Sequence, residues 1–362
     1  MRATQKLHDL GQSIWLDNIT RALLTSGKLR EYVRDLSVTG LTSNPTIFDN
    51  AIKAADSYDA AIREKVARGI SGEALFYELA LEDLTQAADL FGAVHEATGR
   101  IDGWVSLELS PALADDAAGS VRAAKELFAR AKRPNLFIKI PGTAAGIKAI
   151  EESIFAGVPV NVTLLFSRAQ YQAAADAYLR GIERRVAAGL DPRVASVASI
   201  FVSRWDVAVQ DKVPAELRNQ LGLAVGLHTY QAYCELLQSG RWKKLGDAGA
   251  LPQRLLWAST GTKDPKAKDT FYVEALAAPD TVNTMPEQTL IAFAAHGDVG
   301  AVLPKDGGEA QKLLAEFAKA GVNEDALAAE LQRAGAESFM KSWQSLLGQI
   351  DAKSATLVKR AG

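Results

Sequence analysis

One lysine interrupts an otherwise apolar segment, LFIKIPGT (136–143), in which Phe137, Ile138 and Ile140 flank Lys139. A strand lysine can have a structural explanation, because its stem packs on apolar surface while its ammonium reaches water at the rim. A chemical role requires the neutral amine, and at pH 7 only about one lysine in 2,500 is neutral at the usual pKa of about 10.4. Because burial in an apolar wall lowers a lysine pKa, we predict that Lys139 is a Schiff-base nucleophile.

Two carboxylates lie at the ends of other predicted strands. Asp17 ends SIWLD (13–17), and Glu108 lies in WVSLELS (104–110). An acid at a strand end often only caps a loop or pairs with a surface base. Imine chemistry on a sugar needs one acid/base for a hydroxyl group and a second for the protons of imine formation and hydrolysis. Asp17 and Glu108 are the candidates, with Thr163 and a water molecule as a relay.

Uncharged polar residues recur near the same strand ends. Asn161 and Thr163 are two positions apart, so they point to one face of their strand. Asn44 and Ser199 follow or lie in other predicted strands. A single strand serine or threonine is usually structural, but a ring of polar groups at one height is harder to explain by packing. We predict that Asn44, Asn161 and Ser199 orient substrate hydroxyls.

Candidate anion ligands follow two later strands. Arg204 ends ASIFVSR, and Ser259 and Lys263 lie in WASTGTK. The loops after strands 7 and 8 of a barrel often bind phosphate, although Lys263 is also explained as a solvated loop lysine. The stretch PGTAAGIK (141–148) follows a strand and opens a helix, but it lacks the spacing and the Lys-Ser/Thr of a nucleotide-binding P-loop. It is therefore not predicted to bind a nucleotide.

These residues must be positioned by strands that alternate with helices. Strands are predicted at 13–17, 37–42, 104–110, 136–142, 160–165, 194–201, 254–260 and 270–276. Apolar residues between them recur at i, i+3, i+4 and i+7, the helical pattern. Eight such units predict a parallel (β/α)₈ TIM barrel. An open doubly wound sheet is the alternative, but it usually has fewer strands.

The C-terminal region predicts helices beyond the barrel. The chain is predicted to be a single barrel domain over residues 1–362, with a helical extension from about 309. Phe339, Trp343, Leu347 and Ile350 form one apolar stripe in this extension, which we expect to pack on the barrel.

The composition excludes several other classes of protein. A net charge of −2, without a run of five like charges, does not favour a nucleic-acid or membrane partner. The single cysteine, Cys234, fits a buried position and a reducing cytoplasm. The four histidines have no metal-ligand spacing. We therefore predict a cytoplasmic protein with no metal or organic cofactor.

Several segments together resemble the transaldolase family, in the family's order along the chain. They are GLTSNPTIF (40–48), LFIKIPGTAAGIKAIEE (136–152), VPVNVTLLFS (158–167), ASIFVSRWD (198–206) and NTMPEQTL (283–290). The resemblance implies a class I aldolase-type barrel of the longer bacterial subfamily. It also implies transfer of dihydroxyacetone from sedoheptulose 7-phosphate to glyceraldehyde 3-phosphate in the pentose phosphate pathway, giving erythrose 4-phosphate and fructose 6-phosphate.

By position, the resemblance implies a role for each candidate residue. Lys139 is similar to the Schiff-base lysine and Asp17 to the acid/base at the C4 hydroxyl. Glu108 and Thr163 resemble the pair that works through a catalytic water. The remaining positions resemble substrate-hydroxyl contacts and the phosphate site, and they are Asn44, Asn161, Ser199, Arg204 and Ser259. Sugar phosphates are the expected partners, and a homodimer and a monomer both stay open.

The sequence departs from the shorter transaldolases at two places. Pro141-Gly142 stands where those proteins have Ala-Ser or Ala-Ala. Gly261 stands where they carry an arginine, and Lys263 is the candidate replacement for that charge.

Two other functions remain open at this point. A fructose 6-phosphate aldolase would keep the lysine and release free dihydroxyacetone, but those aldolases are much shorter and usually lack the glutamate. A sugar-phosphate-binding barrel without turnover predicts the loss of Asp17, Glu108 or Lys139, and all three are present.

Overall fold

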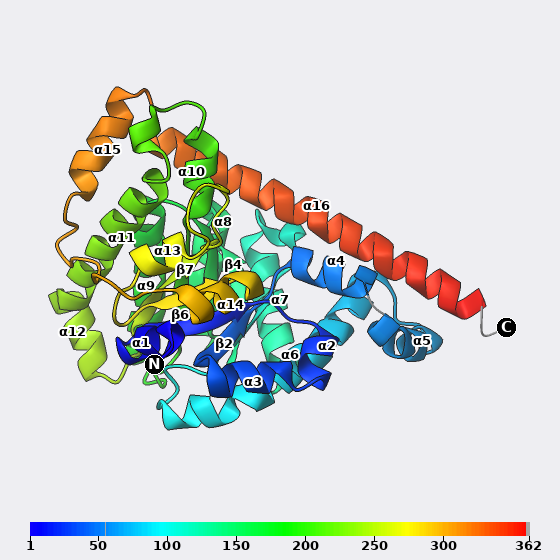
Figure 1. Ribbon diagram of the computed structural model, residues 1–362. Helices are drawn as coiled ribbons and strands as arrows, with labels where there is room; N and C mark the ends of the chain where they lie inside the picture. Colours follow the sequence, from blue (N-terminus) through cyan, green and yellow to red (C-terminus); the bar gives the residue numbers. More distant parts are fainter. Residues whose placement is uncertain (55, 360–362) are drawn as a thin grey trace.

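Eight parallel strands close into a barrel in chain order, as predicted (Figure 1). This computed structural model describes residues 1–54 and 56–359. The strands are β1 (Ser13–Asp17), β2 (Val38–Thr42), β3 (Val105–Glu108), β4 (Leu136–Pro141), β5 (Val160–Leu165), β6 (Ser196–Phe201), β7 (Gln253–Ala258) and β8 (Val282–Met285). Each of the first seven strands begins and ends within two residues of the predicted limits.

Helices fill the connections and surround the barrel. The α-helices before β5 are α1 (Ala3–Asp9), α2 (Arg21–Thr25), α3 (Lys28–Asp35), α4 (Pro45–Ala54), α5 (Asp59–Ala67), α6 (Gly72–Ala97), α7 (Ala117–Ala131) and α8 (Ala144–Phe155). Those after it are α9 (Arg168–Ala187), α10 (Ser203–Val209), α11 (Leu221–Gln238), α12 (Gly240–Asp247), α13 (Phe271–Ala275), α14 (Glu287–His296), α15 (Ala310–Lys319) and α16 (Glu324–Lys359). Short 3₁₀ turns are η1 (Asp56–Tyr58), η2 (Pro111–Leu113) and η3 (Ala215–Leu217). Within the described part of the chain, no helix has the length and apolar character needed to cross a membrane.

The prediction of the eighth strand at 270–276 is wrong. That segment contains the helix α13, in which Tyr272 and Val273 are buried together with Leu276 one turn later. The strand that closes the barrel is β8, four residues long, which pairs with both β1 and β7. Its sequence, VNTM, is short and half polar. It therefore lacks the apolar run by which the other strands were found.

Side chains of the strands alternate between the barrel interior and the helix layer. On β4, Ile138 and Ile140 pack in the cluster formed with the surrounding helices, whereas Phe137 packs in the interior cluster. Inside the barrel the ring of Phe137 stacks on Trp104 with 4.1 Å between centroids. The predicted apolar wall around Lys139 is therefore wrong for Ile138 and Ile140, since strand alternation turns them away from the lysine.

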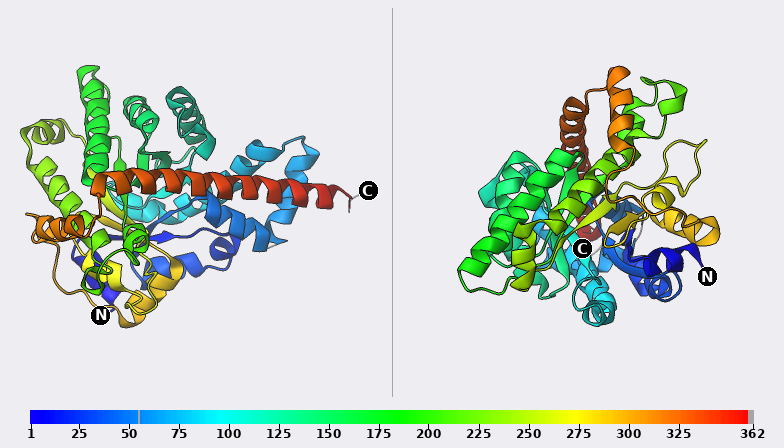
Figure 2. Two further views of the ribbon diagram at one scale, coloured as in Figure 1. Left: turned by 90° about the horizontal axis from the view of Figure 1, so that it is seen from above. Right: turned by 90° about the vertical axis from the view of Figure 1, so that its left-hand side faces the viewer.

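The C-terminal helices extend beyond the barrel, and α16 runs as one long helix across the molecule (Figure 2). It packs on α4, α5 and α6 and also contacts η2 and β5. Phe339, Trp343 and Ile350 are buried, in agreement with the predicted stripe. Leu347 is only half-buried, and the adjacent Leu346 is fully buried in its place. Because this helix contacts β5, it reaches the end of the barrel where the predicted site lies.

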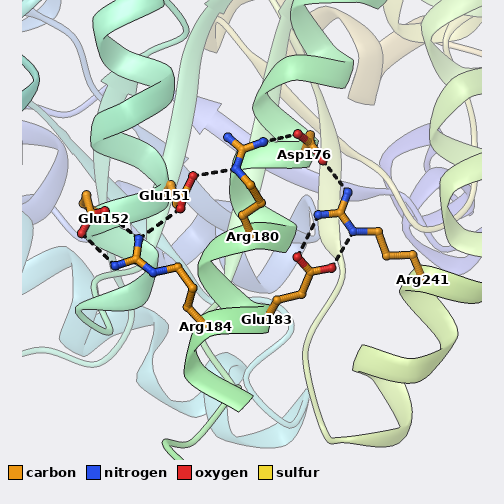
Figure 3. Close-up of polar contacts among 7 residues, drawn as sticks. All are labelled: Glu151, Glu152, Asp176, Arg180, Glu183, Arg184 and Arg241. Atoms are coloured by element: carbon orange, nitrogen blue, oxygen red, sulfur yellow. Dashed lines mark hydrogen bonds and ion pairs between the residues drawn. The ribbon is translucent and has the colours of Figure 1, made fainter. Parts of the chain in front are cut away.

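A chain of ion pairs ties the outer helices α8, α9 and α12 together (Figure 3). Arg180 lies between Glu151 and Asp176, and Arg241 lies between Asp176 and Glu183. Arg184 also pairs with Glu151 and with Glu152. These side chains are partly exposed, between 21% and 50%, so each pair is screened by solvent and contributes only about 0–1 kcal/mol to stability. The network supports the helix layer and takes no part in the site.

Candidate active site

The predicted site residues converge on one cavity of about 140 Å³ at the carboxyl end of the strands. Nine of the ten line it: Asp17, Asn44, Lys139, Asn161, Thr163, Ser199, Arg204, Ser259 and Lys263. The tenth, Glu108, contacts Lys139 from the side. They come from strands or following loops throughout the barrel, which is the usual construction of a site in this fold.

Strand register places three of these residues side by side. Glu108 on β3 is opposite Lys139 on β4, and Lys139 is opposite Asn161 on β5. Residues opposite each other in neighbouring parallel strands point to the same face, which here is the barrel interior. The lysine therefore has a carboxylate on one side and an amide on the other.

Lys139 and Glu108 form a buried ion pair. The Lys139 Nζ lies 2.8 Å from Glu108 Oε2 and donates a hydrogen bond of 2.9 Å to the Ser43 carbonyl oxygen. Each of the paired residues is only 6% exposed. Burial raises the pKa of Glu108, and the charge of Lys139 opposes that rise. A proton that moves from the ammonium to this carboxylate removes both buried charges, so Glu108 is a suitable acceptor for it.

Asp17 is held by a chain of threonine hydroxyls. Thr42 Oγ1 donates to Asp17 Oδ1 at 2.8 Å, and the hydroxyls of Thr42 and Thr284 are 2.6 Å apart. While Asp17 is ionised, the single Thr42 proton points at it, so Thr284 donates to Thr42. Burial raises the pKa of Asp17, while Lys139, Thr42 and Lys263 oppose the rise. A buried carboxyl group whose pKa is raised can both take and return a proton during a reaction.

The uncharged groups differ in how much of their bonding capacity is used. Asn161 is fixed, because its amide nitrogen donates to Ser106 Oγ at 3.1 Å and its oxygen accepts from Ser199 Oγ at 2.7 Å. Thr163 is fully buried, and its hydroxyl has no hydrogen-bond partner among the described residues. Its oxygen is therefore available to a water molecule or substrate in the cavity.

Asn44 and Ser259 occupy special backbone positions beside the cavity. Asn44 Oδ1 accepts from the Ile47 backbone N–H at 3.0 Å, which caps the start of α4. Ser259 follows β7 with a φ of 57°, a conformation that serines seldom adopt. Its hydroxyl lies 2.9 Å from the Ser203 hydroxyl. Both residues are held in place by local bonds while they face the cavity.

Two cations border the cavity without an acidic partner. No carboxylate of the described residues lies within 4.0 Å of the Arg204 guanidinium or the Lys263 amine. Burial lowers the pKa of Arg204, and Glu108 partly opposes this. The guanidinium instead lies 5.1 Å from the ring centre of Phe201. A half-buried arginine without a counter-ion beside a polar cavity is suited to bind an anionic group.

The set of candidate residues from the sequence did not include seven lining residues: Thr42, Phe201, Ala258, Gly261, Thr284, Pro286 and Phe339. Thr42 and Phe201 lie on predicted strands. The alternation of side chains between the two faces of a strand could have shown that both point into the barrel. Thr284 was missed because β8 was misplaced. Phe339 was expected only to pack, and nothing local in the sequence shows that α16 reaches the cavity. Among the described residues, no group of three or more His, Cys, Asp or Glu side chains is arranged to hold a metal ion.

Comparison with known proteins identifies the family. The family model described as Transaldolase/Fructose-6-phosphate aldolase matches residues 14–350. The transaldolase of Saccharopolyspora erythraea is 45% identical over 96% of this chain and 96% of its own. Those of Thermobifida fusca and Thiobacillus denitrificans are 43% and 42% identical over 96% and 97% of this chain, and over 96% and 100% of their own. The chain therefore belongs to the transaldolase family and is a transferase of that family.

Proposed function

We propose that this protein transfers a dihydroxyacetone unit from sedoheptulose 7-phosphate to glyceraldehyde 3-phosphate, through a Schiff base on Lys139. The observation that carries the proposal is the 2.8 Å pair of Lys139 and Glu108 beside a polar cavity bordered by two unpaired cations. The products would be erythrose 4-phosphate and fructose 6-phosphate, which is a reaction of the pentose phosphate pathway.

Imine formation uses the Lys139–Glu108 pair. Glu108 takes a proton from Nζ, and the neutral amine attacks the ketose carbonyl carbon C2. The carbon–oxygen bond of the resulting carbinolamine breaks, and its oxygen leaves as water with a proton supplied by Glu108. Glu108 on β3 and Thr163 on β5 belong to the two strands that flank β4, so they can hold the water between them.

Carbon–carbon cleavage uses Asp17. The iminium withdraws electrons from C3, and Asp17 takes the proton of the C4 hydroxyl, so that the C3–C4 bond breaks and an aldose phosphate leaves. The electron pair stays on the bound three-carbon unit as an enamine. Attack of this enamine on the aldehyde of the acceptor reverses these steps. The raised pKa of Asp17, caused mainly by burial, suits both proton transfers.

The remaining residues orient the two sugar phosphates. Asn161, held by Ser106 and Ser199, and Asn44, held by its helix cap, are fixed donors and acceptors for hydroxyls. Arg204, Ser259 and Lys263 form the proposed phosphate site. Lys263 is two positions from Gly261, and both line the cavity, which supports the idea that this lysine supplies the charge of the missing arginine.

The location and partners belong to the same proposal. We place the enzyme in the cytoplasm with sugar phosphates as its partners and with neither nucleic acid nor membrane. The single buried cysteine, Cys234, is compatible with that reducing location. The steps above use only groups of the chain itself, so no cofactor is proposed. A homodimer and a monomer are both compatible with this chemistry.

A two-substrate assay separates the proposed function from its alternatives. Fructose 6-phosphate is supplied with and without erythrose 4-phosphate, and sedoheptulose 7-phosphate, glyceraldehyde 3-phosphate and free dihydroxyacetone are measured. A transferase forms sedoheptulose 7-phosphate with the acceptor and releases little dihydroxyacetone without it. Equal release of dihydroxyacetone in both conditions would show an aldolase instead. Binding of fructose 6-phosphate without any product would show a binding protein.

A further inference from the structure

A second, small cavity lies behind the Lys139–Glu108 pair, under α16. It has a volume of about 20 Å³ and is lined by Glu108, Ser110, Ala114, Ala336 and Phe339 among others. Most of its lining is apolar, but Glu108 and Ser110 lie in its wall, and the buried Ser110 hydroxyl has no hydrogen-bond partner among the described residues. A cavity of this size can hold one water molecule bonded to these two groups. Of the ion pair, Lys139 lines the main cavity and Glu108 lines the small one, while Phe339 lines both. The phenylalanine ring therefore separates two spaces that meet at the reacting pair.

The small cavity lies close to the surface of the molecule. Four of its lining residues, Pro111, Ala114, Pro141 and Ala336, are only half-buried, so the cavity lies just beneath the solvent-exposed surface. Its two polar residues, Glu108 and Ser110, are buried on the inner side. A narrow passage between Ala114 and Ala336 would admit few water molecules while it connects Glu108 to the surface.

Imine chemistry requires water to leave and to return while a sugar occupies the main cavity. When Nζ attacks C2, the ketone and the amine give an imine and one water molecule, which carries the former C2 oxygen. Hydrolysis consumes one water molecule to restore the ketone and the amine. A sugar phosphate held by Arg204 and Lys263 would lie between this point and the mouth of the main cavity. The front route is then closed to the water.

We propose that this water exchanges with solvent through the small cavity under α16, past Ser110 and out between Ala114 and Ala336. The inference rests on the proposed function. The inference assigns α16 a role besides packing. Ala336 lines the small cavity, and Phe339 separates it from the cavity that binds the substrate.

Oxygen exchange tests the route. The protein is incubated with fructose 6-phosphate in water enriched in ¹⁸O, and label in the C2 oxygen of the recovered sugar is measured against the glyceraldehyde 3-phosphate released. Uncatalysed exchange is subtracted. In Ala336→Leu the larger side chain fills the cavity, and we expect exchange per cleavage event to fall about tenfold, while the adduct still forms. Ala114→Leu fills the same cavity from the opposite wall. It separates the effect of filling the cavity from the effect of a displaced α16.

Ala334→Leu is the matched control, because it makes the same change on the exposed face of α16. We expect this variant to exchange the C2 oxygen as often per cleavage event as the wild-type protein does. Unchanged exchange per cleavage event in both Ala336→Leu and Ala114→Leu would overturn the inference. If the wild-type protein releases no glyceraldehyde 3-phosphate, the proposed function fails first, and this inference falls with it.

Discussion

The two ends of the barrel both bury charged groups, but they use them differently. At the amino end, Ser13 bridges Asp102 and Arg254, since it donates to the carboxylate and accepts from the guanidinium at 2.7 Å. Asp102 also accepts from Trp15 Nε1 at 2.7 Å, and Arg254 donates to the Thr281 carbonyl at 2.8 Å. At the carboxyl end, Glu108 and Lys139 lie beside cavities.

This difference shows that neither cavity size nor buried charge alone marks the active site. The cavity at the amino end, lined by Asp102 and Arg254, has a volume of about 380 Å³, larger than the 140 Å³ of the proposed site. Its charges are bound to hydroxyl, indole and carbonyl groups, and no lysine is among its lining residues. At the carboxyl end a nucleophile, two carboxylates with raised pKa values and the unpartnered hydroxyl of Thr163 converge. Such a combination favours chemistry.

The largest expected effect is the loss of the nucleophile. Lys139→Met keeps the length of the side chain and removes the amine. We expect kcat to fall by at least about 10⁴-fold, because no other group can form the covalent intermediate. Steady-state transfer of dihydroxyacetone checks this, with circular dichroism to confirm folding. A folded variant that retains a tenth of the activity would show that Lys139 is not the nucleophile.

Matched amide substitutions compare the two ends directly. Glu108→Gln removes the proton acceptor, and we expect kcat to fall about 10²–10⁴-fold. Asp102→Asn makes the same chemical change at the amino end, and we expect kcat to stay near that of the wild type. Instead it should lower the free energy of unfolding by about 1–3 kcal/mol, because a buried hydrogen bond is lost. The measurements are transfer kinetics and urea unfolding of both variants.

The reverse pattern would break the comparison. If Asp102→Asn lowers kcat as far as Glu108→Gln does at equal folded fraction, the amino end takes part in the reaction and the assignment of roles is wrong.

A smaller effect is expected at the mouth of the cavity. Lys263→Met should raise KM for fructose 6-phosphate about tenfold with a smaller change in kcat, since one phosphate contact is lost while Lys263 is only the weakest of the groups that act on the pKa of Asp17. Activity on unphosphorylated fructose should change much less than KM for the phosphorylated sugar. Lys266→Met, an exposed lysine of the same loop outside the cavity lining, is the control. An equal rise of KM in both variants would assign the effect to general surface charge.

The smallest effect concerns stability and its dependence on pH. Because the pKa of folded Asp17 is raised above its usual 3.8, the folded state binds the proton more tightly than the unfolded state. Ionisation of Asp17 therefore costs stability as pH rises from about 4 through the raised pKa. We expect Asp17→Asn to be more stable than the wild type at pH 8, on the order of 1 kcal/mol, and to lose this advantage towards pH 4. Thermal melts across this range measure it, and an advantage that is largest at pH 4 would contradict the sign.

Much of the fold and the site could be predicted from the sequence, because strong local signals coincided. Seven strands have apolar runs of ordinary length, and helical periodicity separates them. Lys139, Asp17 and Glu108 are unusual residue types at strand ends, so they stand out without knowledge of the fold. Their convergence followed once a closed parallel barrel was predicted, since all strands of such a barrel end at one face.

The rest depends on contacts that are distant in the chain. β8 is too short and polar to be distinguished from the neighbouring α13 segment. Strand register, which places Glu108 opposite Lys139, is not encoded in a local pattern. The apolar wall expected around Lys139 was wrong because alternation turns Ile138 and Ile140 outward. Phe339 reaches the site only through the path of α16 across the barrel.

Reductive trapping tests the central claim that Lys139 forms the Schiff base. The protein is treated with borohydride in the presence of fructose 6-phosphate, digested, and its peptides are analysed by mass spectrometry. We predict one stable adduct with the mass of a reduced dihydroxyacetone unit, on the peptide that contains Lys139. Lys139→Met should give none. An adduct on another lysine, or no adduct while transfer proceeds, would contradict the account.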